Sequence, residues 1–566
     1  MTPEQAAAHL ADTDPRFELT DADIDGVRYR VFRNAPAHLR ELLEAAAPAY
    51  GERDVLVYQD ERWSYPRLCD EVTRLAHALG QDLNVAAGDR VALAMRNYPE
   101  LPILILAITA MGAVAVPMNA WWTEQELAYA LEDCGARVVF ADGPRYQQIR
   151  PGAARLGLDL VAVRDADGER RYADLLAARS ETHWPDTAIA TDNDFAVLYS
   201  SGSTGHPKGV RLTHRGAISA VYSWVMARLM APLLLDEPPP APANPPASLV
   251  VTPLFHVTAL QSNFLQGLAT GTTMSLMYKW DAEEAVRIIK RERVTRFVGV
   301  PTQSAELMDA ARRMGEKLES LEAIGGGGAK RPAVQVGQLA EAFPGAAIAS
   351  GWGMTETNAL GITLAGPDYV SHPEAAGRPT PPLQEFRIVD GEGRPLPVGE
   401  VGELTVKSAA NMRGYLNLPE ATAQTLRAGW LLTGDLAYQD DNGLFYIVDR
   451  KKSIIIRGGE NISCLEVEGV LHRHPDVVEA GVFPVPDPRL GETVGAGVQL
   501  KAGARVSEAQ LIAFVAEHIA RFKAPERIWM RADTLPRGGT DKIDRRALRD
   551  ECLAAGHPGL PLPSTV

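Results

Sequence analysis

Residues 195–210 read Phe-Ala-Val-Leu-Tyr-Ser-Ser-Gly-Ser-Thr-Gly-His-Pro-Lys-Gly-Val. The apolar start is typical of a buried strand, and the rest is rich in glycine and hydroxyl side chains. Glycines let a backbone approach an anion closely, and consecutive N–H groups and hydroxyls can surround a phosphate. Lys208 adds a mobile positive charge. The spacing differs from GxxxxGK[ST], so we expect a strand followed by a phosphate-binding loop that is not a Walker loop.

The segments around this stretch alternate between strand and helix patterns. Residues 90–95 and 136–140 are expected to be strands, with a helix over 122–133 between them. Residues 101–117 indicate a buried helix followed by a strand. This alternation predicts parallel sheets that are covered by helices. From residue 389 onward short strands and turns, including 399–406, indicate a small β lobe.

The length of 566 residues predicts three or four structural lobes, because domains average about 150 residues. The pattern breaks near residues 449–452, so residues 453–566 are expected to form a separate α+β domain. We therefore expect an α/β protein with a large N-terminal domain, which contains two doubly wound α/β lobes and the small β lobe. The proline-rich stretch 236–246 is expected to be an exposed loop.

Composition excludes several function classes. Net charge is −15, from 57 basic and 72 acidic residues, which disfavours a nucleic-acid partner. Residues 1–15 lack the basic start and apolar core of a secretion signal, and no apolar run appears long enough for an integral membrane segment. The four cysteines are far apart, which suits neither a metal site nor a disulfide framework. We therefore expect a cytoplasmic enzyme.

Further motifs follow residues 199–210 in a fixed order. They are Pro-Leu-Phe-His at 253–256, Gly-Trp-Gly-Met-Thr-Glu-Thr at 351–357, Thr-Gly-Asp at 433–435, Tyr-Ile-Val-Asp-Arg-Lys-Lys at 446–452 and a terminal segment ending at Lys542. Over about residues 35–550 the chain resembles the adenylate-forming superfamily of acyl- and aryl-CoA synthetases, peptide-synthetase adenylation domains and beetle luciferases. The resemblance implies a large domain over 1–449, a hinge at 450–452 and a mobile domain over 453–566.

The resemblance also implies an ATP site. The residues it places against the phosphates are Ser200, Ser201, Gly202, Ser203, Thr204, Gly205 and Lys208. Thr204 and Glu356 would contact Mg²⁺, a hard ion that prefers oxygen ligands. Further nucleotide contacts would come from Gly351, Trp352, Gly353, Met354 and Thr355, with Trp352 stacked on adenine and Thr355 bonded to the α-phosphate. Asp435, between a strand and a turn, and Arg450 would hold the ribose.

The acyl group and its activation are assigned in the same way. The turn Gly328, Ala329 and Lys330 would face the adenine and the acyl group, although relatives usually have proline at the position of Lys330. His256 would position the carboxylate, and Lys542 would reach across the domain cleft to the carboxylate and the α-phosphate. Relatives usually have glycine where this chain has Asp541, next to that lysine. The acyl pocket would be lined by Thr258, Leu260, Ser262 and Gly327.

Two half-reactions would share this site, because the mixed anhydride formed first must pass to an acceptor. The mobile domain would rotate about Lys452 and bring Gly458 and Gly459 to the cleft, where a pantetheine arm passes close to the backbone. Lys279 aligns with a lysine that contacts CoA in plant phenylpropanoid-CoA ligases. ATP, Mg²⁺ and coenzyme A are therefore the expected cofactors.

The expected function is AMP-forming synthesis of acyl-CoA from a carboxylic acid. A medium- or long-chain fatty acid is the first reading, and an aryl acid such as a cinnamate or benzoate is the alternative. Loading of a separate carrier protein is a second alternative. A non-catalytic nucleotide-binding regulatory subunit is a reading of another class. The sequence leaves open whether the chain forms a homodimer.

Overall fold

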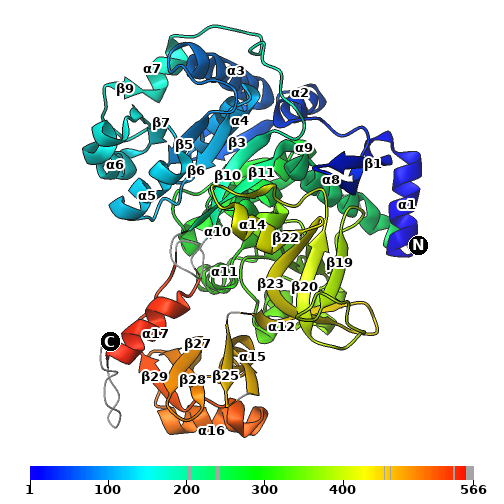
Figure 1. Ribbon diagram of the computed structural model, residues 1–566, viewed down its shortest axis with the longest axis vertical. Helices are drawn as coiled ribbons and strands as arrows, with labels where there is room; N and C mark the ends of the chain where they lie inside the picture. Colours follow the sequence, from blue (N-terminus) through cyan, green and yellow to red (C-terminus); the bar gives the residue numbers. More distant parts are fainter. Residues whose placement is uncertain (201–206, 236–241, 452, 459, 539–541, 556–566) are drawn as a thin grey trace.

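The computed structural model describes residues 1–200, 207–235, 242–451, 453–458, 460–538 and 542–555. Two large sheets, a small β lobe and a C-terminal domain make up most of the described chain (Figure 1). The C-terminal domain, in orange and red, lies at the opposite end of the molecule from the lobe that contains α3 and α7. The expected α/β class and the division into a large and a small domain are confirmed.

The first large sheet has eight strands, parallel from β10 to β9 and antiparallel at the β21 edge. In order they are β21 (Gly414–Tyr415), β11 (Lys208–Thr213), β10 (Asp194–Ser200), β6 (Val114–Pro117), β5 (Arg90–Ala94), β7 (Val138–Ala141), β8 (Asp159–Ala162) and β9 (Arg170–Arg171). One face packs on α3 (Tyr65–Gln81) and α4 (Glu100–Ala110), and the other on α5 (Glu124–Cys134) and α6 (Gly143–Leu156). Every residue of α4 is buried, which explains why its sequence is apolar on all sides.

The second large sheet has nine strands and is parallel through its centre. In order they are β18 (Arg378–Pro379), β17 (Ile362–Ala365), β16 (Ala347–Trp352), β15 (Ala323–Gly326), β14 (Arg296–Gly299), β12 (Ala247–Val250), β13 (Thr273–Leu276), β3 (Asp54–Tyr58) and β4 (Glu61–Ser64). The helices α10 (Ala282–Glu292), α11 (Pro301–Met314) and α12 (Ala333–Ala342) share a core with one face. The helices α2 (Leu39–Tyr50), α8 (His214–Met230) and α9 (Gln266–Thr270) belong to the core of the other.

Helix α8 runs directly into the short helix η2 (Ala231–Leu234), and this feature differs from the sequence expectation. Among the described helices, this 21-residue stretch has a mean hydropathy of 1.4 and is long and apolar enough to cross a membrane. The expectation that no run reaches that length is therefore not confirmed. The helix packs against α1 (Pro3–Thr13), α9 and β11, and it buries His214 and Ser223 completely. In these contacts 44% of its apolar stretch is buried.

Three smaller sheets complete the described fold, and one of them is the two-stranded pair β1 (Leu19–Ile24) and β2 (Val27–Phe32). The β lobe contains β19 (Glu385–Val389), β20 (Gly402–Lys407), β22 (Leu426–Arg427), β23 (Trp430–Gln439) and β24 (Phe445–Arg450). The C-terminal domain contains β25 (Ile454–Arg457), β26 (Glu460–Ser463), β27 (Val477–Asp487), β28 (Gly491–Leu500) and β29 (Arg527–Arg531). Its helices are α15 (Cys464–Leu471), α16 (Glu508–His518) and α17 (Arg545–Ala554). This domain has a core of its own, built on residues such as Ile455, Val482 and Val515.

Candidate functional site

The candidate site lies where strands of both large sheets end. β10 ends at Ser200, β15 ends at Gly326 and β16 ends at Trp352. The carboxyl ends of parallel strands lie on one edge of a sheet, which is where ligands bind in open α/β folds. Most of the expected phosphate loop, Ser201, Gly202, Ser203, Thr204 and Gly205, lies outside the described residues. Its two ends are described, because Ser200 pairs with Lys208 across the β10–β11 hairpin.

Lys208, Tyr415 and Glu356 meet at this edge. The Lys208 Nζ lies 4.8 Å from the centre of the Tyr415 ring, and the Tyr415 hydroxyl donates to Glu356 Oε1 at 2.9 Å. β21 carries Tyr415 and pairs with β11, which carries Lys208. Burial raises the pKa of Glu356, and the nearby Arg450 and Lys208 oppose that rise. The sequence reasoning missed Tyr415, since the pairing of β21 with β11 was not apparent from the motifs.

Glu356 meets the requirements of a magnesium ligand. It is only 7% exposed, yet no ion pair to its carboxylate is found within the described part of the chain. Those residues also contain no group of three or more His, Cys, Asp or Glu side chains that could enclose a metal. Mg²⁺ commonly takes one or two carboxylates together with substrate phosphates, and a single buried glutamate beside a phosphate loop fits that donor set. Thr204, the other expected ligand, lies outside the described residues.

Asp435 is held by partners from two other segments. Its Oδ2 accepts the indole N–H of Trp352 at 2.8 Å, and its Oδ1 lies 3.3 Å from Nε of Arg450. Asp435 does not lie between a strand and a turn, as expected, but inside β23. There Gly434 has a φ of +73°, and the register with β20 shifts, so the strand bulges and redirects the carboxylate. Stacking of Trp352 on adenine stays a prediction.

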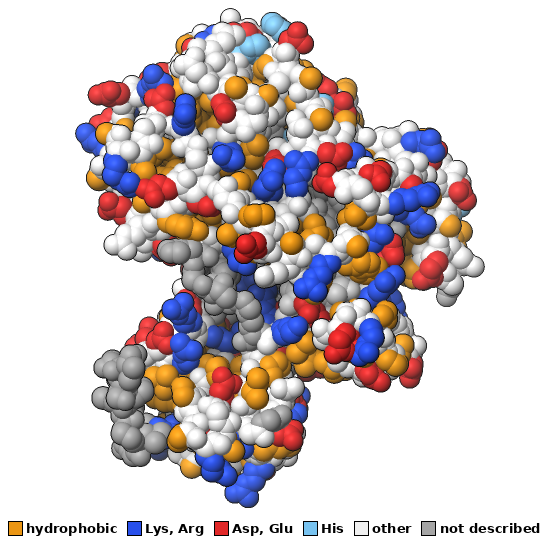
Figure 2. All heavy atoms as spheres, viewed as in Figure 1, with side chains coloured by type: hydrophobic (Ala, Val, Ile, Leu, Met, Phe, Trp, Pro, Cys, Tyr) orange, Lys and Arg blue, Asp and Glu red, His pale blue; other side chains and the backbone are white. Residues whose placement is uncertain are grey.

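Lys542 reaches from the small domain to the large one. Its Cε would lie 3.4 Å from a Cβ placed on Gly328, a residue with a φ of +80°. Burial, together with Arg450 and Arg545, lowers the pKa of Lys542 to about 8, and Asp435 partly opposes this. The structure therefore brings together the Lys542, Gly328 and Asp435 named from separate motifs. On the face shown in Figure 2, lysine and arginine side chains lie along the hollow between the small domain and the rest of the molecule.

Two other residues expected at the nucleotide turn, Ala329 and Lys330, lie at the surface. Ala329 is exposed, and the Lys330 Nζ lies 3.3 Å from Glu374 Oε2 at the surface. The next residue, Arg331, is only 2% exposed and donates through Nη1 to Gln335 at 2.8 Å. Gly353 and Met354 connect β16 to the short helix Thr355–Thr357, which contains Glu356, so Met354 and Thr355 follow Gly351 and Trp352 along the chain.

The residues expected at the acyl group lie after β12. The His256 carbonyl accepts the N–H of Leu260 at 3.0 Å and starts a helix that becomes π-helical over Thr258–Leu265. The Thr258 methyl would lie 3.6 Å from a Cβ on Gly327, so these two residues are neighbours. Leu260 is completely buried, and Ser262 donates its hydroxyl to the Thr258 carbonyl at 2.7 Å.

The residues expected to contact CoA are not gathered at Asp435. Lys279 is exposed in the segment after β13. Gly458, with a φ of +60°, donates its N–H to the Leu490 carbonyl inside the small domain at 2.8 Å. Gly459 and Lys452 lie outside the described residues. In this arrangement the small domain thus presents Lys542, and not Gly458, to the Gly328 turn.

The comparisons with known proteins agree with this geometry. Residues 43–416 match the AMP-binding enzyme model, and residues 466–542 match the AMP-binding enzyme C-terminal domain. Feruloyl-CoA synthase of Amycolatopsis sp is 34% identical over 486 residues, which are 86% of this chain and 93% of that protein.

Two solved structures also resemble the chain closely. One is o-succinylbenzoate coenzyme A synthetase from Bacillus subtilis in complex with ATP and magnesium ion, with a TM-score of 0.76 and 28% identity over 90% of this chain and 99% of that one. The other is a fatty acyl CoA synthetase of Mycobacterium tuberculosis, with a TM-score of 0.71 and 29% identity over 92% and 99%. The resemblance noted from the motifs is confirmed, and the chain belongs to the AMP-binding enzyme family.

Proposed function

We propose that this protein is an acid–thiol ligase, which activates a carboxylic acid with ATP as acyl-AMP and transfers the acyl group to CoA. The products are acyl-CoA, AMP and pyrophosphate. The observation that carries the proposal is the meeting of Lys542, from the small domain, with Gly328 and Asp435 of the large domain and with Arg450 of the hinge. A lysine held between two domains next to a phosphate-binding edge is placed to act on a nucleotide that lies in the cleft.

Adenylation brings two anions together, so charge neutralisation and positioning carry most of the catalysis. Lys208, at the start of β11, neutralises the leaving pyrophosphate, and Lys542 neutralises the carboxylate and the α-phosphate. Asp435, fixed by the Trp352 N–H and Arg450, holds the ribose hydroxyls. When bound, Mg²⁺ supplies Lewis-acid charge on the phosphate oxygens, and Glu356 is the described residue that would hold it.

Transfer to CoA requires another placement of the small domain. We assign the hinge to residues 450–452, around Lys452, and a rotation there would take Lys542 out of the cleft and bring the Gly458 hairpin in. Free CoA is the acceptor that we favour over a carrier protein. Thioester formation measured in parallel with CoA and with a phosphopantetheinylated carrier separates the two acceptors. Product with the carrier alone would refute the choice of CoA.

The acid that we favour is aryl, with a polar substituent on the ring. The support comes from the helix that begins beside Gly327, where Gln261 Oε1 and Asn263 Nδ2 are buried without a hydrogen-bond partner among the described residues. Buried polar atoms that stay unpaired cost about 1–3 kcal/mol each, and a hydroxyl or carboxyl group on the acid could satisfy them. The similarity to feruloyl-CoA synthase points the same way.

A medium- or long-chain fatty acid is the second candidate, favoured by the fully buried Leu260 and the methyl group that Thr258 turns to Gly327. The test is ATP–pyrophosphate exchange, followed by thioester formation, over hydroxylated cinnamic and benzoic acids and over C6–C16 fatty acids. Aryl acids should give the higher kcat/KM. A preference for fatty acids would overturn the aryl assignment and keep the ligase. No exchange with any acid would overturn the ligase itself, in favour of a regulatory nucleotide-binding protein.

The cytoplasm is the compartment that we propose, since all four cysteines are free thiols. Cys134, Cys464 and Cys552 are buried, and burial raises the pKa of each thiol. A membrane association would show as co-sedimentation with lipid vesicles. A homodimer would show as a light-scattering mass of twice 61.2 kDa.

A further inference from the structure

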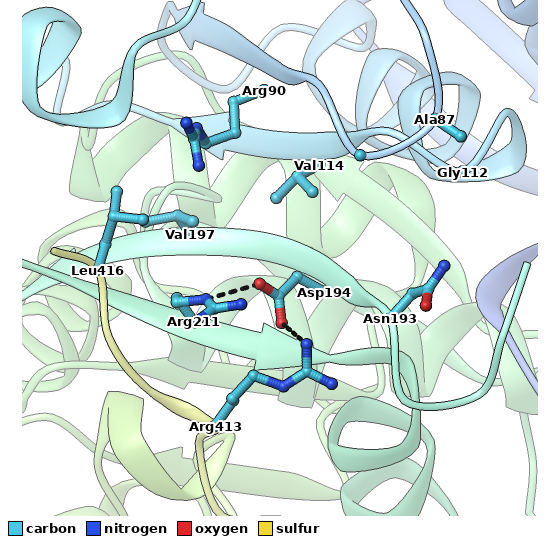
Figure 3. Close-up of a pocket in the computed structure, with 11 residues that line it drawn as sticks. Ala87, Arg90, Gly112, Val114, Asn193, Asp194, Val197, Arg211, Arg413 and Leu416 are labelled. Carbon is cyan, nitrogen blue, oxygen red and sulfur yellow. Dashed lines mark hydrogen bonds and ion pairs between the residues drawn. The ribbon is translucent and has the colours of Figure 1, made fainter. Parts of the chain in front are cut away.

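A second cavity lies at the other edge of the eight-stranded sheet. β5 begins at Arg90, β6 at Val114 and β10 at Asp194, so their amino ends surround this cavity, while the candidate active site lies at the carboxyl ends. Its volume is about 340 Å³. Its lining includes Ala87, Arg90, Asp194, Arg211 and Arg413 (Figure 3).

Three guanidinium groups and one carboxylate face this cavity. Asp194 is shared by two of the arginines, with Oδ2 at 2.7 Å from Arg211 Nε and Oδ1 at 3.1 Å from Arg413 Nη1. Arg90 lies across the hollow from this group, and no dashed line joins it to another residue in Figure 3. Its Nε is buried and has no hydrogen-bond partner among the described residues. The lining therefore carries two positive charges that Asp194 does not balance.

Nearby carboxylates are engaged elsewhere. Asp192 binds Arg215 through both oxygens, at 2.6 and 2.7 Å. Asp89, beside Arg90 in the sequence, accepts the backbone N–H of Ala86 at 2.9 Å. Neither aspartate lines the cavity. An anion that entered would therefore meet Arg90 without displacing an existing ion pair of that residue.

We propose that this cavity binds a small molecule with phosphate or carboxylate groups, at a site separate from the active site. Guanidinium groups bind both groups strongly through paired, charge-assisted hydrogen bonds. The apolar Val114, Val197 and Leu416 form the remaining wall, so an organic anion fits the lining better than a bare ion. A cavity of about 340 Å³ is in the range of small-ligand sites.

The test measures binding of two probes by calorimetry, with the nucleotide site filled by a non-hydrolysable ATP analogue and Mg²⁺. Inorganic phosphate and succinate represent the two anion chemistries, and the tighter one identifies the class. We expect saturable binding of one equivalent to the wild type, with a dissociation constant below about 10 mM. Arg90→Gln should weaken it at least about tenfold, which is the effect of losing one charged hydrogen-bonding pair.

Two further variants control for poor folding of Arg90→Gln and for a general effect of losing positive charge. Ala87→Glu adds a carboxylate at an exposed rim position and removes no native contact, so it should also weaken binding at least about tenfold even if Arg90→Gln folds poorly. Arg150→Gln removes the same charge from an exposed position on α6 that does not line the cavity, and it should leave binding unchanged. Absence of saturable binding to the wild type, or equal binding by Ala87→Glu, would overturn the proposal. An equal loss in Arg150→Gln would overturn it too.

Discussion

Adenylation should be lost as the pH rises through 8, and the reason is the environment of Lys542. Burial, Arg450 and Arg545 lower the pKa of Lys542 to about 8, whereas an ordinary lysine titrates near pH 10.4. The lysine must carry its proton to stabilise the negative charge that develops on the α-phosphate and the carboxylate. A group with a folded pKa near 8 is protonated below that pH and neutral above it, so activity should fall on the alkaline side.

The size of the effect follows from that pKa. With a midpoint of about 8, about 91% of Lys542 is charged at pH 7 and about 9% at pH 9, so kcat/KM for ATP should fall about tenfold between them. Bound ATP adds negative charge and raises the pKa of Lys542, so kcat should fall at higher pH than kcat/KM. A pair of unit charges at a contact distance of about 4 Å is worth about 4 kcal/mol at an effective dielectric constant of 20, so Lys542→Ala should slow adenylation about a thousandfold.

The assay is ATP–pyrophosphate exchange from pH 6.5 to 9.5 at constant free Mg²⁺ and ionic strength. The second half-reaction is measured from supplied acyl-AMP and CoA. Lys542→Ala should lose the alkaline limb of the first reaction, keep most of the second, and melt no lower at pH 7, because it removes a cation from beside Arg450 and Arg545. A pH profile of kcat/KM that is flat up to pH 9.5, or an equal loss of both half-reactions, would refute the reasoning.

Three further changes test the rest of the site. Tyr415→Phe removes the hydrogen bond to Glu356 while keeping the ring next to Lys208, so kcat/KM for MgATP should fall about tenfold or more. A dependence of activity on magnesium concentration that is unchanged would contradict this. Asp435→Asn should raise the KM for ATP at least about tenfold and shrink the preference for ATP over 2′-deoxy-ATP, as steady-state kinetics with both nucleotides would measure. Gly434→Ala places a side chain at a φ of +73° and should lower the free energy of unfolding by about 1 kcal/mol in urea titrations. An unchanged free energy of unfolding would contradict this prediction.

The local structure of the large sheets could be predicted because it depends on short-range patterns. The strands expected at 90–95 and 136–140 are β5 and β7, and the helix expected at 122–133 is α5. Strand order could not be predicted in the same way. β21, only two residues long, lies beside β11 although about 200 residues separate them, and this pairing brings Tyr415 to Lys208. A pattern search on so short a strand has too few positions to show a period.

The same limit applies to the second cavity. Arg90, Arg211 and Arg413 belong to different segments, and each looks like an ordinary surface arginine in the sequence. Their common position at the amino edge follows only from the order of β5, β10, β11 and β21. Lys542, by contrast, could be named from its motif, but the lowered pKa depends on Arg450 and Arg545, which only the fold places beside it.

The contacts around Asp449 bear on how the small domain could move. This carboxylate is 1% exposed, and its Oδ2 accepts the Ser463 hydroxyl at 2.9 Å and the Leu465 N–H at 3.0 Å. Asp449 precedes the proposed hinge at Lys452, and both donors follow it. A rotation there therefore separates the carboxylate from two donors, each worth about 1.5–3 kcal/mol for a charged acceptor. After such a rotation the carboxylate would keep only the Arg450 N–H, which donates to Oδ1 at 2.7 Å. Unless the rotated arrangement supplies new donors to Oδ2, Asp449 favours the orientation in which Lys542 meets Gly328.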